Sequence, residues 1–254
     1  MRPLAGMSVL VTGGGSGIGA GTARHLVAGG ARVTVSGRRA EKVGAVAASL
    51  GDACRAVVGD VTVDADRRAM VAAAVEHGGG RLDVLVNNAG NMYRGPLAEL
   101  REDELLSVFH SNVVAGMMLA QLALDHLRAS QGAIVFIGSV HSKRAFPGAA
   151  PYAATKGAVE TLTRVLAAEL GPQGVRVSCV RPGAVFTEIN QRAGLFDDAT
   201  ALARLEGLAS AHALGRIGTV EEVAEAIEYV ARAEWTTGAV VTVDGGLSLG
   251  VTNA

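Results

Sequence analysis

Seven short runs of β-branched and other apolar residues recur along the chain, and helix-length segments separate them. The runs are MSVLVT (7–12), ARVTVS (31–36), RAVVGD (55–60), LDVLVN (82–87), GAIVFIG (132–138), VRVSCV (175–180) and AVVTVD (239–244). Most are apolar nearly throughout, which is typical of strands covered on both faces. Segments such as 17–29, 102–128 and 152–170 are long enough to be helical crossovers. This alternation predicts an α/β fold: a doubly wound, seven-stranded parallel sheet with helices on both faces.

No linker, repeat or low-complexity tract divides the 254 residues, so we expect a single domain spanning 1–254. Trp235 is the only tryptophan, and we expect it to pack near the last strand. The formal charge of −1 argues against a nucleic-acid partner, because such surfaces are usually strongly basic.

Neither a membrane span nor a metal site is expected. No apolar run reaches the roughly 18 residues that a span needs, and the first residues lack a signal-peptide pattern. Cys54 and Cys179 are too few for a disulfide framework, and the six histidines form no metal-binding spacing. A reducing cytoplasm is the expected location.

A glycine-rich turn, TGGGSGIG (12–19), follows the first apolar run. Glycines let the backbone approach a phosphate closely, and the following helix start would offer free N–H groups and a positive dipole end. Gly13, Gly17 and Gly19 form a T-G-x-x-x-G-x-G pattern, which differs from the usual G-x-G-x-x-G spacing. The turn therefore predicts a dinucleotide-binding site whose glycine spacing differs from the usual fingerprint.

A phenol and an ammonium group occur four residues apart in APYAATKGAVETL (150–162), at Tyr152 and Lys156. On a helix they share one face. Free tyrosine has a pKa near 10, but one positive charge about 4 Å away is worth roughly 4 kcal/mol at an effective dielectric of about 20. That is about 3 pK units in favour of the phenolate, which would bring a tyrosine into the useful range for general acid–base catalysis.

The remaining motifs fall at the ends of the other apolar runs. They are GDV (59–61), NNAG (87–90), IGS (137–139), RPG (181–183) and VDGG (243–246). Together with the glycine-rich turn and the Y-x-x-x-K pair, in this order and at these spacings, they resemble the short-chain dehydrogenase/reductase family over almost the whole chain. The resemblance implies a Rossmann-type domain and an NAD(P)-dependent oxidoreductase that interconverts a secondary alcohol and a ketone.

The resemblance also implies four catalytic residues. Tyr152 would be the general acid/base, and Ser139 would hydrogen-bond the substrate oxygen. Lys156 would lower the pKa of Tyr152 and hold the ribose hydroxyls of the cofactor. Asn112 would keep a water in a proton relay to Lys156.

The end of the second run bears on the choice of cofactor. An acidic residue there normally binds the ribose of NAD, whereas a nearby Arg suits the 2′-phosphate of NADP. Here Gly37 is followed by Arg38 and Arg39, so NADP is favoured, with NAD as the alternative if both are solvated surface charges. The cofactor contacts implied by the resemblance are Gly13, Ser16, Gly17, Ile18, Gly19, Arg38, Arg39, Asp60, Val61, Asn87, Ala89, Gly90, Tyr152, Lys156, Gly183, Val185 and Thr187.

The substrate is less constrained by the sequence. Residues 186–218 mix apolar side chains, including Leu195, Phe196, Leu202, Leu205 and Leu208, with charged ones, as a substrate lid would. His141, Lys143 and Arg144 could meet an anionic or polyol substrate, although a solvent-exposed loop is the favoured interpretation. A secondary alcohol or ketone is expected, with a 3-oxoacyl thioester or a sugar as possible classes.

Two other functions stay open: a non-catalytic, nucleotide-binding redox sensor, and an epimerase or dehydratase of a longer-chain branch. The complete Ser-Tyr-Lys set argues against the first, and the roughly 70 residues after the sixth run are few for the second. Family resemblance further implies a homotetramer.

Overall fold

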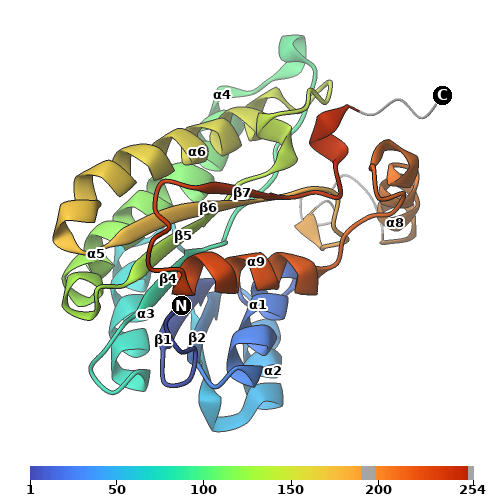
Figure 1. The fold of residues 1–254 in the computed structure, drawn as a ribbon. Helices are drawn as coiled ribbons and strands as arrows, with labels where there is room; N and C mark the ends of the chain where they lie inside the picture. The colour runs from blue at the N-terminus through green and yellow to red at the C-terminus, as the bar shows by residue number, and fades with distance from the viewer. Residues whose placement is uncertain (190–197, 251–254) are drawn as a thin grey trace.

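A single seven-stranded sheet runs through the molecule (Figure 1). The computed structural model describes residues 1–189 and 198–250. The strand order is β3-β2-β1-β4-β5-β6-β7, and all neighbours are parallel. The strands are β1 (Ser8–Thr12), β2 (Arg32–Gly37), β3 (Cys54–Val58), β4 (Val84–Asn87), β5 (Ala133–Ile137), β6 (Arg176–Pro182) and β7 (Val240–Val243). The predicted fold class is confirmed, with every strand end within two residues of its expected place.

Helices cover both faces of this sheet. Figure 1 shows α1, α2 and α9 on one side and α3, α5 and α6 on the other, with α8 beyond the strand ends. Their bounds are α1 (Gly17–Ala28), α2 (Ala40–Leu50), α3 (Asp64–His77), α4 (Glu102–Phe109), α5 (Ala115–Ser130), α6 (Ala150–Leu170), α8 (Asp198–Glu206) and α9 (Val220–Arg232). Helix α6 begins two residues before the expected Tyr152, because Pro151 suits the first helical turn.

The central strand β1 shows why the apolar runs do not alternate. Val9 and Val11 face the helices α1, α2 and α9, whereas Leu10 faces α3, α5 and α6. All three side chains are buried. Successive residues of a strand point to opposite faces, so a sheet covered on both sides needs an apolar residue at every position. Each such burial stabilises the fold by about 2 kcal/mol.

The segment predicted as one helix over 102–128 contains a π-helical turn. Helix α4 leads into this turn at His110–Val114, and α5 follows. By length and composition alone, the continuous stretch Glu102–Ser130 could cross a membrane, although charged and polar residues interrupt its apolar positions. In the structure its apolar residues Leu119 and Leu127 are buried against the sheet.

Trp235 corrects an expectation. Its side chain is 99% exposed, so it does not pack near the last strand. Thr237 and Gly238 donate their hydrogen bonds to Val177 of β6, which fixes the turn before β7. These bonds hold the turn without any contribution from the indole.

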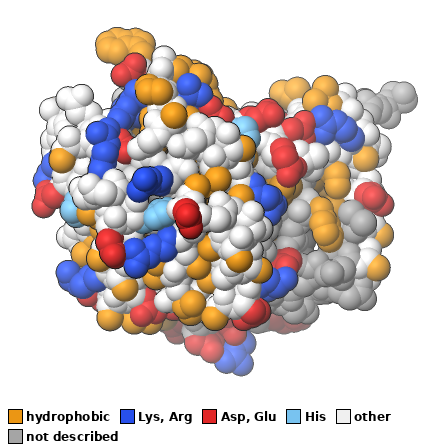
Figure 2. All heavy atoms as spheres, turned by 90° about the horizontal axis from the view of Figure 1, so that it is seen from below, with side chains coloured by type: hydrophobic (Ala, Val, Ile, Leu, Met, Phe, Trp, Pro, Cys, Tyr) orange, Lys and Arg blue, Asp and Glu red, His pale blue; other side chains and the backbone are white. Residues whose placement is uncertain are grey.

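The surface carries both signs of charge. The face seen in Figure 2 mixes Lys and Arg with Asp and Glu side chains instead of gathering one sign into a continuous patch. This mixture agrees with the nearly neutral formal charge of −1.

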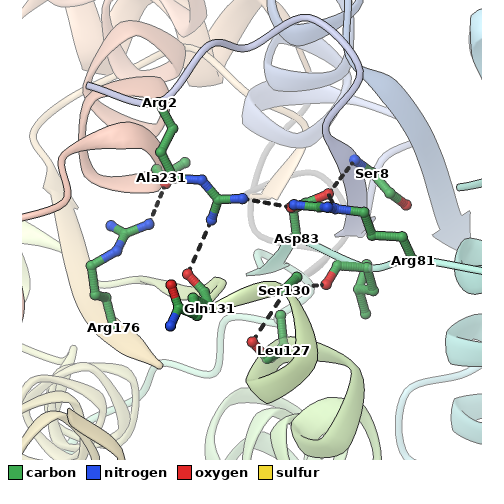
Figure 3. A network of polar contacts seen from close by, with 10 residues as sticks. Arg2, Ser8, Arg81, Asp83, Leu127, Ser130, Gln131, Arg176 and Ala231 are labelled. Carbon is green, nitrogen blue, oxygen red and sulfur yellow. Dashed lines mark hydrogen bonds and ion pairs between the residues drawn. The ribbon is translucent and has the colours of Figure 1, made fainter. Parts of the chain in front are cut away.

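The buried carboxylate of Asp83 links the start of β1 to the start of β4 (Figure 3). This is the end of the sheet opposite the loops that carry the sequence motifs. Asp83 is fully buried and accepts hydrogen bonds from Arg81, from Arg2 at 2.9 Å and from the backbone N–H of Ser8 at 3.0 Å. Burial alone would raise the pKa of Asp83. The hydrogen bonds from Arg81 and Ser8 and the charges of both arginines outweigh burial and hold this pKa below its usual value.

A second buried arginine closes helix α9. Arg176 donates to the carbonyl oxygens of Val230, Ala231 and Ala233 at 2.7–2.9 Å. The last carbonyls of a helix lack partners within the helix, so this guanidinium satisfies groups that would otherwise be buried unpaired. The first residue of β6 is thereby joined to the end of α9.

Replacing Asp83 by Asn should lower the free energy of unfolding by about 3 kcal/mol near neutral pH, because a neutral amide cannot compensate both arginines. The folded-state pKa of Asp83 is depressed. Its contribution is therefore fully present above the unfolded pKa of about 3.9 and is lost as the pH falls through the folded value. Denaturant titrations at a series of acidic pH values measure this.

Asp103→Asn is the matched control, since Asp103 forms an exposed pair with Arg101 and should matter little. A difference between wild type and Asp83→Asn that stays constant down to strongly acidic pH would contradict this account.

Candidate active site

The site lies where the strand order reverses, between β1 and β4. Loops that follow these two strands leave the same edge of the sheet in opposite directions, and ligands of open α/β sheets bind in that crevice. A cavity of about 390 Å³ opens here. The predicted site residues that line it are Gly13, Ser16, Gly17, Ile18, Ala89, Gly90, Ser139, Tyr152, Lys156, Gly183, Val185 and Thr187.

The glycine-rich turn has the geometry that the sequence predicts. Gly13 and Gly17 have φ values of 65° and 52°, in the left-handed region that favours glycine. A Cβ on Gly19 would lie 2.4 Å from the carbonyl oxygen of Gly13, so a side chain does not fit there. Helix α1 begins at Gly17, and Ser16 makes no side-chain cap. The helix start therefore keeps N–H groups for an anion, and a phosphate fits the turn.

Thr12 joins this turn to the loop after β4. Its hydroxyl oxygen accepts hydrogen bonds from the backbone N–H groups of Asn88, at 3.1 Å, and Ala89, at 3.0 Å. The Asn88 side chain donates in return to the carbonyl oxygens of Thr12, at 2.8 Å, and Gly13, at 3.2 Å. Sequence reasoning gave neither side chain a role, although both stand within motifs that it quoted.

The side chain of Asn87, a residue expected along the cofactor path, points away from the cavity, and its cofactor contact remains a prediction. It does not line the cavity, and a Cβ on Gly116 of α5 would lie 3.5 Å from its amide carbon. Among the described residues, neither its amide oxygen nor its amide nitrogen has a hydrogen-bond partner. The alternation of side chains along β4 turns Asn87 toward α5, and the next residue, Asn88, reaches the cavity instead.

Tyr152 and Lys156 share one face of α6, as their spacing predicts, and both side chains are buried. The Lys156 ammonium nitrogen lies 5.5 Å from the centre of the Tyr152 ring and donates to the carbonyl oxygen of Ile137 at 2.7 Å. Burial lowers the pKa of Lys156 to about 8. The ammonium is therefore mostly protonated at neutral pH and places a positive charge beside the phenol.

Ser139 lies in the same corner as His141, which sequence reasoning assigned to an exposed loop. His141 instead lines the cavity, with its Nδ1 atom 3.0 Å from the Ser139 hydroxyl oxygen. Its ring stacks on Phe146 at 4.3 Å and meets the Tyr152 ring edge-on at 5.2 Å. Burial, with the charges of Arg94 and Lys156, lowers the pKa of His141 to about 4. The imidazole is neutral at physiological pH.

Asn112 lies in the π-helical turn and is buried. Its side chain accepts from the N–H of Asn91 at 2.8 Å and donates to the Asn91 carbonyl at 2.9 Å and to Thr155 at 3.1 Å. Asn112 thus fixes the loop after β4 against α6. The water relay to Lys156 remains a prediction.

A buried ion pair supports the catalytic corner. Glu160, one helical turn after Lys156, receives two hydrogen bonds from Arg181 of β6, at 2.6 and 2.7 Å. The Ser142 hydroxyl also contacts Glu160. Burial would raise the pKa of Glu160, but these hydrogen bonds and the charge of Arg181 lower it. The pair joins α6, β6 and the loop that carries Ser139. The spacing of Glu160 from Lys156 indicates only that both lie on one face of the helix.

A second hollow of about 200 Å³ adjoins the main cavity at Gly13 and Ser16. Arg38, Arg39 and Lys42 line it. Arg39 donates to Ser16 at 3.2 Å and to Glu188 at 2.6 Å, and Lys42 also pairs with Glu188 at 3.2 Å.

Asp60 lies 3.6 Å from Arg38, which brings the ends of β2 and β3 together. Neither Asp60 nor Val61 lines either of these two hollows. The adenine contacts assigned to both residues therefore remain predictions.

The far end of the main cavity is largely apolar, with Met92, Phe146, Leu205, Leu208 and Leu247 in its wall. Of the residues expected at its mouth, Lys143 is exposed outside it and Arg144 donates to the Leu247 carbonyl at 2.8 Å. Leu205 and Leu208 belong to the predicted lid 186–218. Leu195 and Phe196 lie outside the described residues, as does the side chain of Leu202.

Replacing Thr12 by Val should lower the free energy of unfolding by about 2 kcal/mol, because two backbone N–H groups lose their acceptor. It should also weaken nicotinamide cofactor binding, because the loop after β4 loses its attachment to the glycine-rich turn. Urea unfolding and fluorescence titration with NADPH and NADH measure the two effects. Thr12→Ser keeps the hydroxyl and should resemble the wild type; equal losses in both variants would refute the role of that oxygen.

Comparison with known proteins agrees with this geometry. The family model for short chain dehydrogenase matches residues 7–197. A granaticin polyketide synthase putative ketoacyl reductase 2 of Streptomyces violaceoruber is 39% identical over 245 residues, covering 94% of this chain and 95% of that protein. An L-fucose dehydrogenase of Bos taurus is 38% identical over 251 residues, covering 97% and 91%.

A solved structure extends the likeness to three dimensions. The 3-ketoacyl-(acyl-carrier-protein) reductase from Brucella melitensis, complexed with NADH, superimposes with a TM-score of 0.88 at 31% identity, covering 96% of this chain and 99% of that one. Sequence motifs, strand order and site geometry lead to one family. The chain belongs to the short-chain dehydrogenase family and is an oxidoreductase that uses a nicotinamide cofactor.

Proposed function

We propose that this protein interconverts a secondary alcohol and a ketone, with Tyr152 as the general acid/base. The observation that carries the proposal is the grouping of Tyr152, the buried ammonium of Lys156 and the Ser139 hydroxyl in one cavity. The same cavity reaches the glycine-rich turn, so reacting groups and cofactor phosphates would share one continuous site.

The bound nicotinamide would supply or accept the hydride. The residues of the chain handle the proton at the substrate oxygen. During reduction, the Tyr152 hydroxyl donates a proton to that oxygen while Ser139 hydrogen-bonds it, and during oxidation Tyr152 takes the proton back. The Lys156 charge stabilises the phenolate that forms on Tyr152. Thr12, Asn88 and Asn112 hold the surrounding loops in place, so the reacting groups need little rearrangement.

Replacing Tyr152 by Phe should reduce turnover of a ketone panel by at least about 10³-fold, because the proton donor is lost. Cofactor affinity should change little, since the ring and Lys156 remain. NADPH and NADH consumption give the rate, and fluorescence titration gives the affinity. Tyr93→Phe is the matched control, because the Tyr93 hydroxyl bonds the backbone of Arg101 outside the cavity. Substantial turnover in Tyr152→Phe would remove Tyr152 from the mechanism.

NADP is the cofactor we favour. Three positive side chains, Arg38, Arg39 and Lys42, line the hollow that adjoins the glycine-rich turn at the end of β2. Arginine suits the 2′-phosphate of NADP, and Gly37 stands where an acidic side chain would bind the ribose of NAD. Glu188 neutralises part of this positive charge, because it pairs with both Arg39 and Lys42.

NADPH should bind about tenfold or more tightly than NADH, since charge-assisted hydrogen bonds to a phosphate contribute roughly 1.5–3 kcal/mol. Arg39→Gln should remove most of this preference by weakening NADPH alone. Arg55→Gln alters an exposed ion pair with Glu76 away from the cavity and is the control. Fluorescence titration distinguishes the outcomes: equal affinities, or tighter NADH, would make these cations ordinary surface charges.

Assembly, location and the lid over 186–218 remain predictions. Apolar side chains are exposed on the helical stretch 102–130 and on α6, which are among the elements that relatives commonly pair between subunits: Leu106 (63%), Val114 (42%), Met117 (38%) and Val165 (56%). Exposed apolar residues gathered on two neighbouring helices support a homotetramer. A small-molecule substrate is the expected partner, and the cytoplasm is the expected compartment.

A further inference from the structure

Arg94 is a positive charge at the substrate end of the main cavity that the mechanism does not use. Its partly buried side chain lines the cavity together with Ser139, His141 and Tyr152. It donates one hydrogen bond, to the carbonyl oxygen of Pro147 at 3.3 Å. Among the side chains that the structure describes, no carboxylate forms an ion pair with its guanidinium.

The position of Arg94 is fixed by the fold. Beside its bond to Pro147, the backbone N–H of Gly95 donates to the carbonyl of Gly148 at 2.9 Å. These two bonds join the loop after β4 to the loop after β5, which carries Ser139 and His141. The charge of Arg94 is also close enough to contribute to the lowered pKa of His141. Arg94 therefore acts on the corner that contains the reacting groups.

The surroundings of Arg94 do not neutralise it. Met92 and Phe146 are apolar, and His141 is neutral at physiological pH. Other cations around the two hollows are engaged: Arg39 and Lys42 pair with Glu188, and Lys156 donates to a buried carbonyl beside the Tyr152 ring. A partly buried charge without a counterion is costly, and a guanidinium offers several donors that match carboxylate or phosphate oxygens.

We propose that Arg94 binds an anionic oxygen group of the substrate, so that the substrate is a hydroxy acid, an oxo acid or a phosphate ester with a secondary alcohol or ketone. The reacting carbon would lie at Tyr152 and Ser139, and the anion at the rim. This inference rests on the proposed alcohol–ketone activity and adds the substrate class to it.

The experiment compares each anionic candidate substrate with a neutral compound of closely similar carbon skeleton. Oxo acids with one to four methylenes between ketone and carboxylate are tested against their methyl esters, and dihydroxyacetone phosphate against dihydroxyacetone. We expect kcat/KM to be about 10- to 100-fold higher for charged members at the best spacing, in keeping with a charge-assisted hydrogen bond. The preferred series, carboxylate or phosphate, identifies the anion.

Arg94→Gln should raise KM for the charged substrate about tenfold or more while leaving the neutral partner nearly unchanged. Arg94→Lys should recover part of the lost affinity, since lysine keeps the positive charge but lacks the paired N–H donors of the guanidinium. Lys143→Gln removes an exposed charge from the neighbouring loop and should have no effect. Preference for neutral substrates, or equal losses on both partners in Arg94→Gln, would overturn the proposal.

A binding measurement separates this proposal from the catalytic one. Calorimetric titration of the same oxo acids and of dihydroxyacetone phosphate into NADPH-loaded Tyr152→Phe requires no turnover. Binding that Arg94→Gln abolishes, without turnover by the wild type, would support the anion site and sink the alcohol–ketone activity. Turnover of neutral ketones without binding of any of these anions would support the alcohol–ketone activity and overturn the anion site.

Discussion

The pairing of β1 with β4 at the centre of the sheet is the constraint on which the site depends. It places the glycine-rich turn and the loop after β4 next to each other, and Thr12 then joins them through its hydroxyl. The apolar runs on both faces make this pairing stable, because each strand is covered by helices on both sides. The cavity forms because β1 and β4 are parallel, but the connections that follow them run toward opposite edges of the sheet.

The catalytic corner shows how burial and polarity are combined. Lys156 lies in a buried place where a charge is unfavourable, and the Ile137 carbonyl and the Tyr152 ring are the contacts it gains there. The neighbouring pair of Glu160 and Arg181 is also buried, and each partner there is satisfied by the other. The two arrangements lie one helical turn apart on α6, so the helix carries a reactive charge and a neutralised pair on one face.

Much of the fold and part of the site could be predicted because they depend on local patterns. Apolar runs indicate buried strands, and the spacing of Tyr152 and Lys156 indicates a shared helix face. The misplaced residues depend on contacts between distant segments. Trp235 is almost fully exposed, and His141 is half-buried because its ring packs against Phe146 and Tyr152. Asn87 and Asn88 differ only in which side of β4 they face, and motif spacing alone did not decide between them.

The two ion pairs of Glu188 have a consequence for communication within the molecule. Glu188 follows β6 by six residues and is held at the nucleotide end by Arg39 and Lys42, while its neighbour Ile189 lines the main cavity. A phosphate that bound these cations would compete with the Glu188 carboxylate for them. If a substrate held this segment at the other end of the cavity, thermodynamic linkage would require the phosphate and the substrate to change each other's affinity by the same factor.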